Sequence, residues 1–236
     1  ANVVTRVVDQ LKEFGETRRG WLGVRIQDVT EDVADAMGLK EATGALVTDV
    51  PDGPAKQAGL KTGDVIMSFD GVAVVDTRSL VRQVGNSPVG QTVRVTVMRE
   101  NKSQTLKVTL GRREDADGEV AVAVPGEEDT PPATPETTAL MGLTLTPLTD
   151  DMREELGADA GMEGLAVTEV DETSEAFEKG LREGDIITEA GQQKISTIAQ
   201  LEERIEDARD GGRKSLLLLV RRAGDPRFVA LSLGDN

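Results

Sequence analysis

The spacing of apolar residues divides this chain into a helical start and two similar halves. Apolar residues at positions 3, 4, 7, 8, 11 and 14 follow the period of a helix, which Gly15 would end. Later runs such as "TVRVTVMR" (92–99) alternate between apolar and polar residues, which predicts strands with one face toward a core. The run "SLLLLV" (215–220) is apolar throughout and far too short to cross a bilayer, so it predicts a buried strand.

Two segments of the first half reappear in the second. The segment "GALVTDV" (44–50) matches "GLAVTEV" (164–170), and "AGLKTGDVIMSFDGVAV" (58–74) matches "KGLREGDIITEAGQQKI" (179–195). The offset is 120 residues before the intervening turn and 121 after it, which indicates a one-residue insertion in a loop. A repeat unit of about 95 residues predicts a duplicated domain rather than a solenoid.

Each half shows the same order of expected elements. A strand that starts at Gly23 or Gly142 precedes a short acidic helix, a second strand and a short helix that ends at Gly59 or Gly180. A hairpin then leads to a longer helix, for which Asp76 and Ser196 are the expected N-caps, and two strands close the half. Five or six short strands with two helices predict an α+β, mostly β fold of two partly open β-barrels.

Composition shifts suggest the domain boundaries. We expect a helix at 1–17, a first domain at 18–113, a linker at 114–138 and a second domain at 139–236. The expected linker holds eight acidic residues, no basic residue and four prolines, which is typical of an extended, semi-rigid connection. Its segment "EVAVAVP" alternates and would also fit a strand added to the first domain.

The composition excludes several kinds of chemistry. The chain has no cysteine and no histidine, which excludes disulfides, thiolate or histidine metal sites and a Ser-His-Asp triad. We therefore expect no catalytic residue, no metal and no cofactor. A mechanism based on Ser-Lys or Asp is formally open, but no motif points to one. Neither a signal peptide nor a transmembrane segment is expected, and a start within a helical pattern suggests a fragment or processed product.

The charge is distributed unevenly. The net charge is −16; residues 1–113 carry 16 basic against 14 acidic side chains, whereas residues 114–236 carry 11 against 29. An acidic surface repels the phosphate backbone, so nucleic acid is not an expected partner.

The glycine at position 23 is unusual at the start of a strand. A residue without Cβ lets the backbone turn so that successive N–H groups point into one concavity, which binds an anion. An extended peptide could add to the following strand and place its C-terminal carboxylate there. Arg18 and Arg19 would attract that carboxylate or serve only as solvated surface charges. The alternative for Gly23 and its counterpart Gly142 is simple relief of a tight turn.

Both halves resemble the PDZ domains of the bacterial HtrA/DegP (protease Do) family. The segments "RRGWLGVRIQDV", "GALVTDVPDGPAKQAGLKTGDVI" and "FDGVAVVDTRSLVRQVGNSPVGQTVRVTVMRE" are similar to the first PDZ domain, and residues 139–236 resemble the second less closely. The helix at 1–17 resembles the one that closes the family's protease domain. The resemblance implies a periplasmic serine endoprotease and chaperone whose protease domain, with its "GNSGGP" motif, is missing from this chain.

The resemblance also implies a peptide site in the first domain. The carboxylate-binding loop maps onto four consecutive residues, Trp21, Leu22, Gly23 and Val24. Val24 and Ile26 would line the pocket for the last peptide side chain, with Val81 and Val84 on the groove side of the long helix and Leu80 in the core. The alternative is that Leu80, Val81 and Val84 all belong to the core.

The second copy departs from this pattern. Its weak counterparts are Leu140, Met141, Gly142, Leu143 and Ile205. Glu202 stands where the first copy has Val81, and a carboxylate there would repel a peptide C-terminus. We therefore expect the second domain to bind C-termini poorly and to serve in assembly or gating. Asp64 and Asp185, which occupy the same turn in both copies, are expected to cap backbone rather than to act in catalysis.

Three functions follow for comparison. The first is a substrate-recognition module that binds C-terminal or extended segments of unfolded proteins in the first groove. The second is a scaffold that joins subunits of the same protease, which the resemblance implies assembles as a trimer or larger cage, without a peptide ligand. The third, an enzyme in its own right, lacks any histidine or nucleophile motif to support it.

Overall fold

The computed structural model describes residues 20–99, 101–112, 138–159 and 161–233. They divide into two compact units, one made of residues 20–28 with the described part of 43–121 and one made of residues 29–42 with the described part of 122–236. The expected helix at 1–17 and the expected linker, apart from Thr138, lie outside the described residues. No helix within the described ranges is long and apolar enough to span a bilayer.

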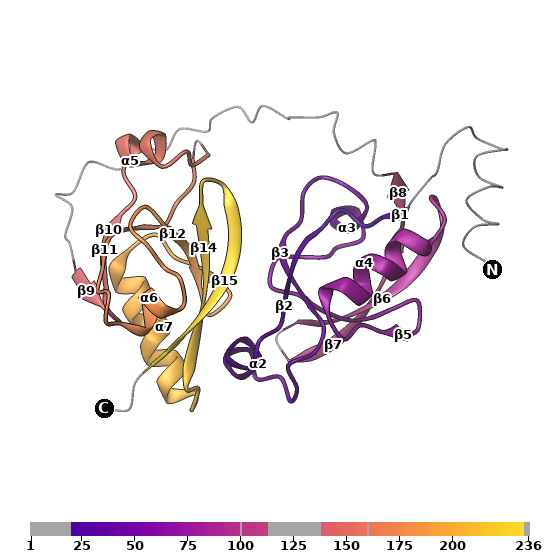
Figure 1. The fold of residues 1–236 in the computed structure, drawn as a ribbon, viewed down its shortest axis with the longest axis horizontal. Coiled ribbons are helices and arrows are strands. Elements are labelled where there is room, and N and C mark those ends of the chain that lie inside the picture. The colour runs from indigo at the N-terminus through magenta and orange to yellow at the C-terminus, as the bar shows by residue number, and fades with distance from the viewer. Residues whose placement is uncertain (1–19, 100, 113–137, 160, 234–236) are drawn as a thin grey trace. The chain divides into compact units, whose positions relative to one another are not determined.

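The first repeat is built on an antiparallel sheet with the strand order β2-β3-β4-β6-β7 (Figure 1). A short strand β5 pairs with β4, while β1 and β8 form a separate two-stranded sheet. The strands are β1 (Gly20–Trp21), β2 (Arg25–Asp28), β3 (Ala45–Asp49), β4 (Val65–Phe69), β5 (Val72–Ala73), β6 (Thr92–Arg99), β7 (Lys102–Thr109) and β8 (Gly111–Arg112). The helices are α2 (Glu31–Met37), which groups with the second unit, α3 (Pro54–Gln57) and α4 (Thr77–Asn86).

The second repeat has the strand order β15-β14-β12-β11-β10-β9, with β13 paired to β12 (Figure 1). The strands are β9 (Thr138–Leu140), β10 (Leu143–Pro147), β11 (Leu165–Val170), β12 (Ile186–Ala190), β13 (Gln193–Lys194), β14 (Ser215–Arg222) and β15 (Asp225–Ser232). The helices are α5 (Asp150–Glu155), α6 (Glu175–Glu178) and α7 (Ile198–Asp210). The main difference from the first repeat is that β9 joins the end of the main sheet by pairing with β10, whereas β1 pairs with β8 in a separate sheet.

Each repeat has its own apolar core between the sheet and its long helix. In β6, Val93, Val95 and Val97 are buried and alternate with more exposed residues, which confirms the predicted one-sided strand. In β14, the six residues from Ser215 to Val220 are all buried, as predicted for "SLLLLV". The predicted mostly β, α+β fold is thereby confirmed, and the main sheet of each repeat does not close into a barrel.

Two expectations about the helices are wrong. The total of two helices per repeat is one too few, although the short helices expected before Gly59 and Gly180 are present as the four-residue helices α3 and α6. The N-cap of α7 is Thr197 rather than Ser196, because the Thr197 hydroxyl accepts the N–H of Gln200. The Gln200 side chain in turn accepts the N–H groups of Ser196 and Thr197. The predicted cap of α4, Asp76, is confirmed and forms the same kind of capping box with Ser79.

Candidate functional site

Among the described residues, strand β2 is an end strand of its sheet, and no other described strand pairs with its outer edge. It pairs with β3, and α4 lies beside it on the other side (Figure 1). An end strand presents a row of backbone N–H and C=O groups that a further strand can pair with. The open edge and the neighbouring helix form the two sides of a groove that suits an extended peptide.

The position of α4 is fixed at both of its ends. At the start, the Thr77 N–H donates a hydrogen bond of 2.8 Å to the carboxylate of Asp28 on β2. Near the end, the Gly20 N–H donates to the Ser87 carbonyl over 3.1 Å. A Cβ on Gly20 would lie only 2.7 Å from the carbonyl oxygen of Val84 and 2.8 Å from that of Ser87. Gly20 therefore permits the close approach of α4, a role that sequence reasoning missed.

The loop between β1 and β2 is the predicted carboxylate-binding loop. Its Leu22 is buried, with 4% of its surface exposed, and the Leu22 carbonyl accepts the N–H of Ala55 over 3.0 Å. Gly23 has φ +78°, the left-handed region that favours glycine. No described residue accepts a hydrogen bond from the N–H groups of Leu22, Gly23 or Val24. These three donors are therefore available to an anion at the start of β2.

The Trp21 ring braces this loop from behind. A Cβ on Gly53 would lie 2.9 Å from the Trp21 ring, and one on Gly111 would lie 3.3 Å from it. Glycines at these places leave room for the ring, which a larger residue there would contact too closely. Trp21 thus supports the loop by packing, and the free donors come from the three residues after it.

The apolar lining of the groove is divided between strand and helix. Val24 and Ile26 are half-buried and pack against the core cluster that includes Leu80 and Val84. Leu80 is 1% exposed and Val84 8%, whereas Val81 is 62% exposed. The alternative that all three helix residues are core is therefore wrong for Val81. Leu80 has its expected place, while Val84 lies at the edge of the core rather than on an open face.

Charge differs sharply between the two long helices. In α4, Arg78 and Arg82 are exposed on either side of Val81 in sequence, and the helix contains no acidic residue. The backbone N–H of Ser79 lowers the pKa of the capping carboxylate of Asp76, with help from the Ser79 hydroxyl. By contrast, α7 contains five acidic residues and two arginines, and its Glu202 is exposed. A peptide carboxylate is favoured beside α4 and disfavoured beside α7.

Sequence comparison identifies both repeats. The profile of the PDZ domain family matches residues 20–110 and again residues 139–233, which together are most of the chain. The chain belongs to the PDZ domain family. Its two repeats are tandem PDZ domains, as the resemblance implied.

Relatives of the tandem PDZ domains are found among bacterial proteases. The chain is 38% identical over 237 residues to a probable periplasmic serine endoprotease DegP-like from Bartonella henselae, and 36% identical to one from Brucella suis. These matches cover 99% and 100% of the chain but 44% of each relative, so the chain spans less than half the length of either protein. A solved structure of the HtrA-type protease AlgW with a tripeptide is 34% identical, covers 50% of this chain and 40% of its own, and has a TM-score of 0.44.

The loop in the second PDZ domain has a different structure from its counterpart. Met141 and Gly142 have φ values of +55° and +77°, the combination of a two-residue type I′ hairpin turn. The turn folds β9 back along β10, with Leu140 opposite Leu143. Ile205 is 5% exposed and lies in the core together with Leu143. The candidate residues of the second domain therefore lie close together, but the strand that they surround is β9 of the same chain.

The buried acids Asp64 and Asp185 have a structural role in both PDZ domains. Asp64 is fully buried, receives the N–H of Lys61 at 2.9 Å, and is held by the Arg99 guanidinium through two contacts of 2.6 and 2.7 Å. In the second domain, Arg222 holds Asp185 in the same way, and this contact raises the pKa of the Arg222 guanidinium. The sequence indicated the turn-capping role but not the distant arginines. Among the described residues, no group of three or more His, Cys, Asp or Glu side chains could hold a metal ion.

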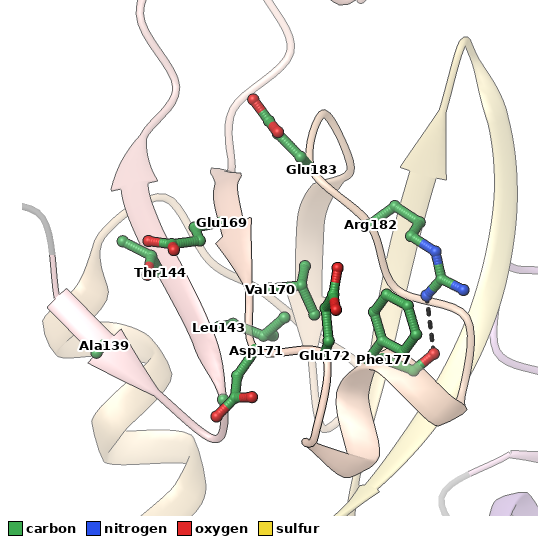
Figure 2. A pocket seen from close by; sticks show the side chains of 11 residues that line it. Ala139, Leu143, Thr144, Glu169, Val170, Asp171, Glu172, Phe177, Arg182 and Glu183 are labelled. Carbon is green, nitrogen blue, oxygen red and sulfur yellow. Dashed lines mark hydrogen bonds between the residues drawn. The ribbon is translucent and has the colours of Figure 1, made fainter.

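A pocket of about 810 Å³ lies beside β10 in the second PDZ domain. Figure 2 shows Ala139 on β9 next to the strand that carries Thr144, and Arg182 beside the Phe177 ring. The Arg182 guanidinium lies 3.8 Å from the ring centre and donates to the carbonyl groups of Phe177 and Leu181. The remaining charged side chains of the lining are acidic: Glu169, Asp171, Glu172 and Glu183. This pocket disfavours a negatively charged ligand.

Proposed function

We propose that the first PDZ domain binds the C-terminal ends of extended peptide segments. The peptide adds antiparallel to β2, its carboxylate accepts hydrogen bonds from the N–H groups of Leu22, Gly23 and Val24, and its last side chain contacts Val24, Ile26 and the α4 residues Val81 and Val84. The outer edge of β2, beside three N–H groups that have no acceptor within the described part of the chain, supports this proposal. The exposed Arg78 and Arg82 add attraction for the carboxylate.

The similarity to DegP-like endoproteases extends the proposal to the whole protein. It is a periplasmic serine endopeptidase in which this region recognises substrates, namely C-terminal or extended segments of unfolded proteins, and contacts other subunits of the same protease. The chain itself has no histidine and supplies no catalytic residue. Its domain boundaries remain those expected from the sequence, at 18–113 and 139–236.

Calorimetric titration with ten-residue peptides that end in Val, Leu or Phe tests this function. A groove of this kind should bind one of them at roughly micromolar strength, about −8 kcal/mol. The matched control is the same peptide with an amidated C-terminus, which lacks the charge that the loop N–H groups would bind. Equal affinity for the two forms contradicts carboxylate binding. If no peptide binds, and light scattering shows that the oligomeric state depends on this region, the scaffold function is favoured instead.

A further inference from the structure

The edge of β10 in the second PDZ domain is occupied by a strand of the same chain. Strand β9 runs antiparallel to β10, with Leu140 opposite Leu143, Ala139 opposite Thr144, and Thr138 opposite Leu145. The tight turn at Met141 and Gly142 connects the two strands directly. The position at which a peptide would extend this sheet is therefore already filled (Figure 2).

The corresponding segment of the first PDZ domain pairs elsewhere. When the loop glycines Gly23 and Gly142 are aligned, the segment Gly20–Trp21 is the counterpart of Ala139–Leu140 in the second repeat. It pairs with Gly111–Arg112 of β8, which leaves β2 open. Equivalent segments of the two repeats thus have different partners, and only one of the two choices leaves the peptide edge open.

Strand β9 has the polarity and the contacts of a bound C-terminal peptide. Its C-terminal residue, Leu140, lies next to the loop, where the last residue of a peptide would lie in the first domain. The Leu140 and Met141 side chains pack against the core cluster that contains Leu201 and Ile205 of α7, and α7 contacts β10. The peptide bond between Leu140 and Met141 stands where a ligand would have its carboxylate.

We propose that the edge of β10 is a second peptide-binding site whose resident ligand is β9, and that an external peptide binds there only when β9 is displaced. This proposal rests on the proposed function for its mode of binding, strand addition beside the long helix. The external ligand is an extended apolar segment that needs no free carboxylate. The loop that would bind a carboxylate forms the tight turn instead, and the nearby side chains of Glu202, Asp171 and Glu172 are acidic. As β9 is tethered to β10 by two residues, it competes at a high effective concentration.

Two substitutions of Leu140 would open the site. In a two-residue hairpin the residues next to the turn form a hydrogen-bonded pair, so Leu140→Pro removes a ladder N–H as well as the leucine side chain. Leu140→Gly removes the side chain and keeps the N–H, which covers the case that the proline variant fails to fold. Ala139→Pro is the matched control, because exposed Ala139 lies in the next, non-hydrogen-bonded pair.

A reversible covalent link would lock the site shut. The chain contains no cysteine, so the double substitution A139C/T144C creates a single possible disulfide. Non-hydrogen-bonded pairs have Cα atoms about 4.5 Å apart, within the range that a disulfide spans. Oxidation is followed by mass spectrometry, and its completion without an added catalyst is itself expected if β9 lies on β10.

The probe is the hexapeptide that copies residues 135–140, acetylated at its N-terminus and amidated at its C-terminus, and binding is read from backbone amide NMR shifts. In Leu140→Pro or Leu140→Gly, the amides of β10 and α7 should shift saturably, with an affinity at least about tenfold higher than in the unmodified chain. Ala139→Pro should behave as the unmodified chain, and the oxidised double variant should show no shift in β10 or α7. The proposal is overturned if neither Leu140 variant that folds binds the probe, or if the oxidised form binds it as well as the reduced form.

The same spectra separate this proposal from the function of the first domain. The free-acid form of the hexapeptide reports on β2 and α4, whose amides are unaffected by the Leu140 substitutions. Absence of shifts in β2 and α4 with all free-acid peptides would contradict the proposed function. In that case, the amide shifts of β10 and α7 would still test the second peptide-binding site independently.

Discussion

Replacement of the buried acid of the first PDZ domain, Asp64→Asn, should destabilise that domain strongly. The Asp64 side chain is 1% exposed, and the Arg99 guanidinium that it pairs with is 21% exposed. The substitution removes the negative charge that pairs with the Arg99 guanidinium and turns one of two acceptor atoms into a donor, while the Lys61 N–H also needs an acceptor there. Breaking a buried pair on one side costs about 3–5 kcal/mol, and we expect about 3 kcal/mol because the asparagine oxygen still accepts hydrogen bonds there.

Urea unfolding followed by Trp21 fluorescence measures this loss in the first domain alone, because Trp21 is the single tryptophan of the chain. With a denaturant slope of about 1.5 kcal/mol per M, the midpoint should fall by about 2 M. The control is Asp52→Asn, which removes an exposed pair with Lys56, 82% and 57% exposed, and should cost less than about 0.5 kcal/mol. A midpoint change for Asp64→Asn no larger than that of the control would refute the reasoning.

Three further predictions concern the groove. Gly23→Ala should cost about 1–2 kcal/mol of stability because of its positive φ, and it should also weaken peptide binding. The control is Gly71→Ala, with φ +82° and open space around it, which should cost a similar amount of stability and leave peptide binding unchanged in calorimetry. Val81→Glu should leave the unfolding midpoint nearly unchanged, because Val81 is exposed, but lower peptide affinity about three- to eightfold, for a repulsion of ~1 kcal/mol; an affinity equal to that of the unmodified chain would remove α4 from the site. The pKa of Asp76 should lie below its ordinary value in an NMR titration, so its stabilisation of α4 is present at neutral pH and is lost as the pH falls through that lowered pKa; an ordinary or raised pKa would contradict the cap geometry.

Local patterns in the sequence predicted most elements of the fold. The duplication, the alternation in β6, the buried run in β14 and the Asp76 cap all depend on neighbouring residues, and all are confirmed. The cap of α7 was misplaced by one residue because Ser196 and Thr197 are both good caps. The choice depends on which of them the Gln200 backbone N–H reaches.

Contacts between distant residues could not be predicted in the same way. The approach of α4 to Gly20 and the pairing of Asp64 with Arg99 join positions 35 or more residues apart, for which a single sequence gives no signal. The partner of β9 was equally hidden. A hairpin turn of this type favours Asn-Gly or Asp-Gly, and Met141-Gly142 does not carry that signature.

Amide hydrogen exchange tests the central difference between the two PDZ domains most directly, because it reports which strand edge is hydrogen-bonded. By register, the Leu143 and Leu145 N–H groups of β10 face β9, and Val24 and Ile26 are their counterparts in the first domain. Without peptide, we predict slow exchange at Leu143 and Leu145 and fast exchange at Val24 and Ile26, which become slow when a free-acid peptide is added. Equal protection of all four amides without peptide, or no protection of Val24 and Ile26 at saturating peptide, would contradict an open first groove and a self-occupied second one.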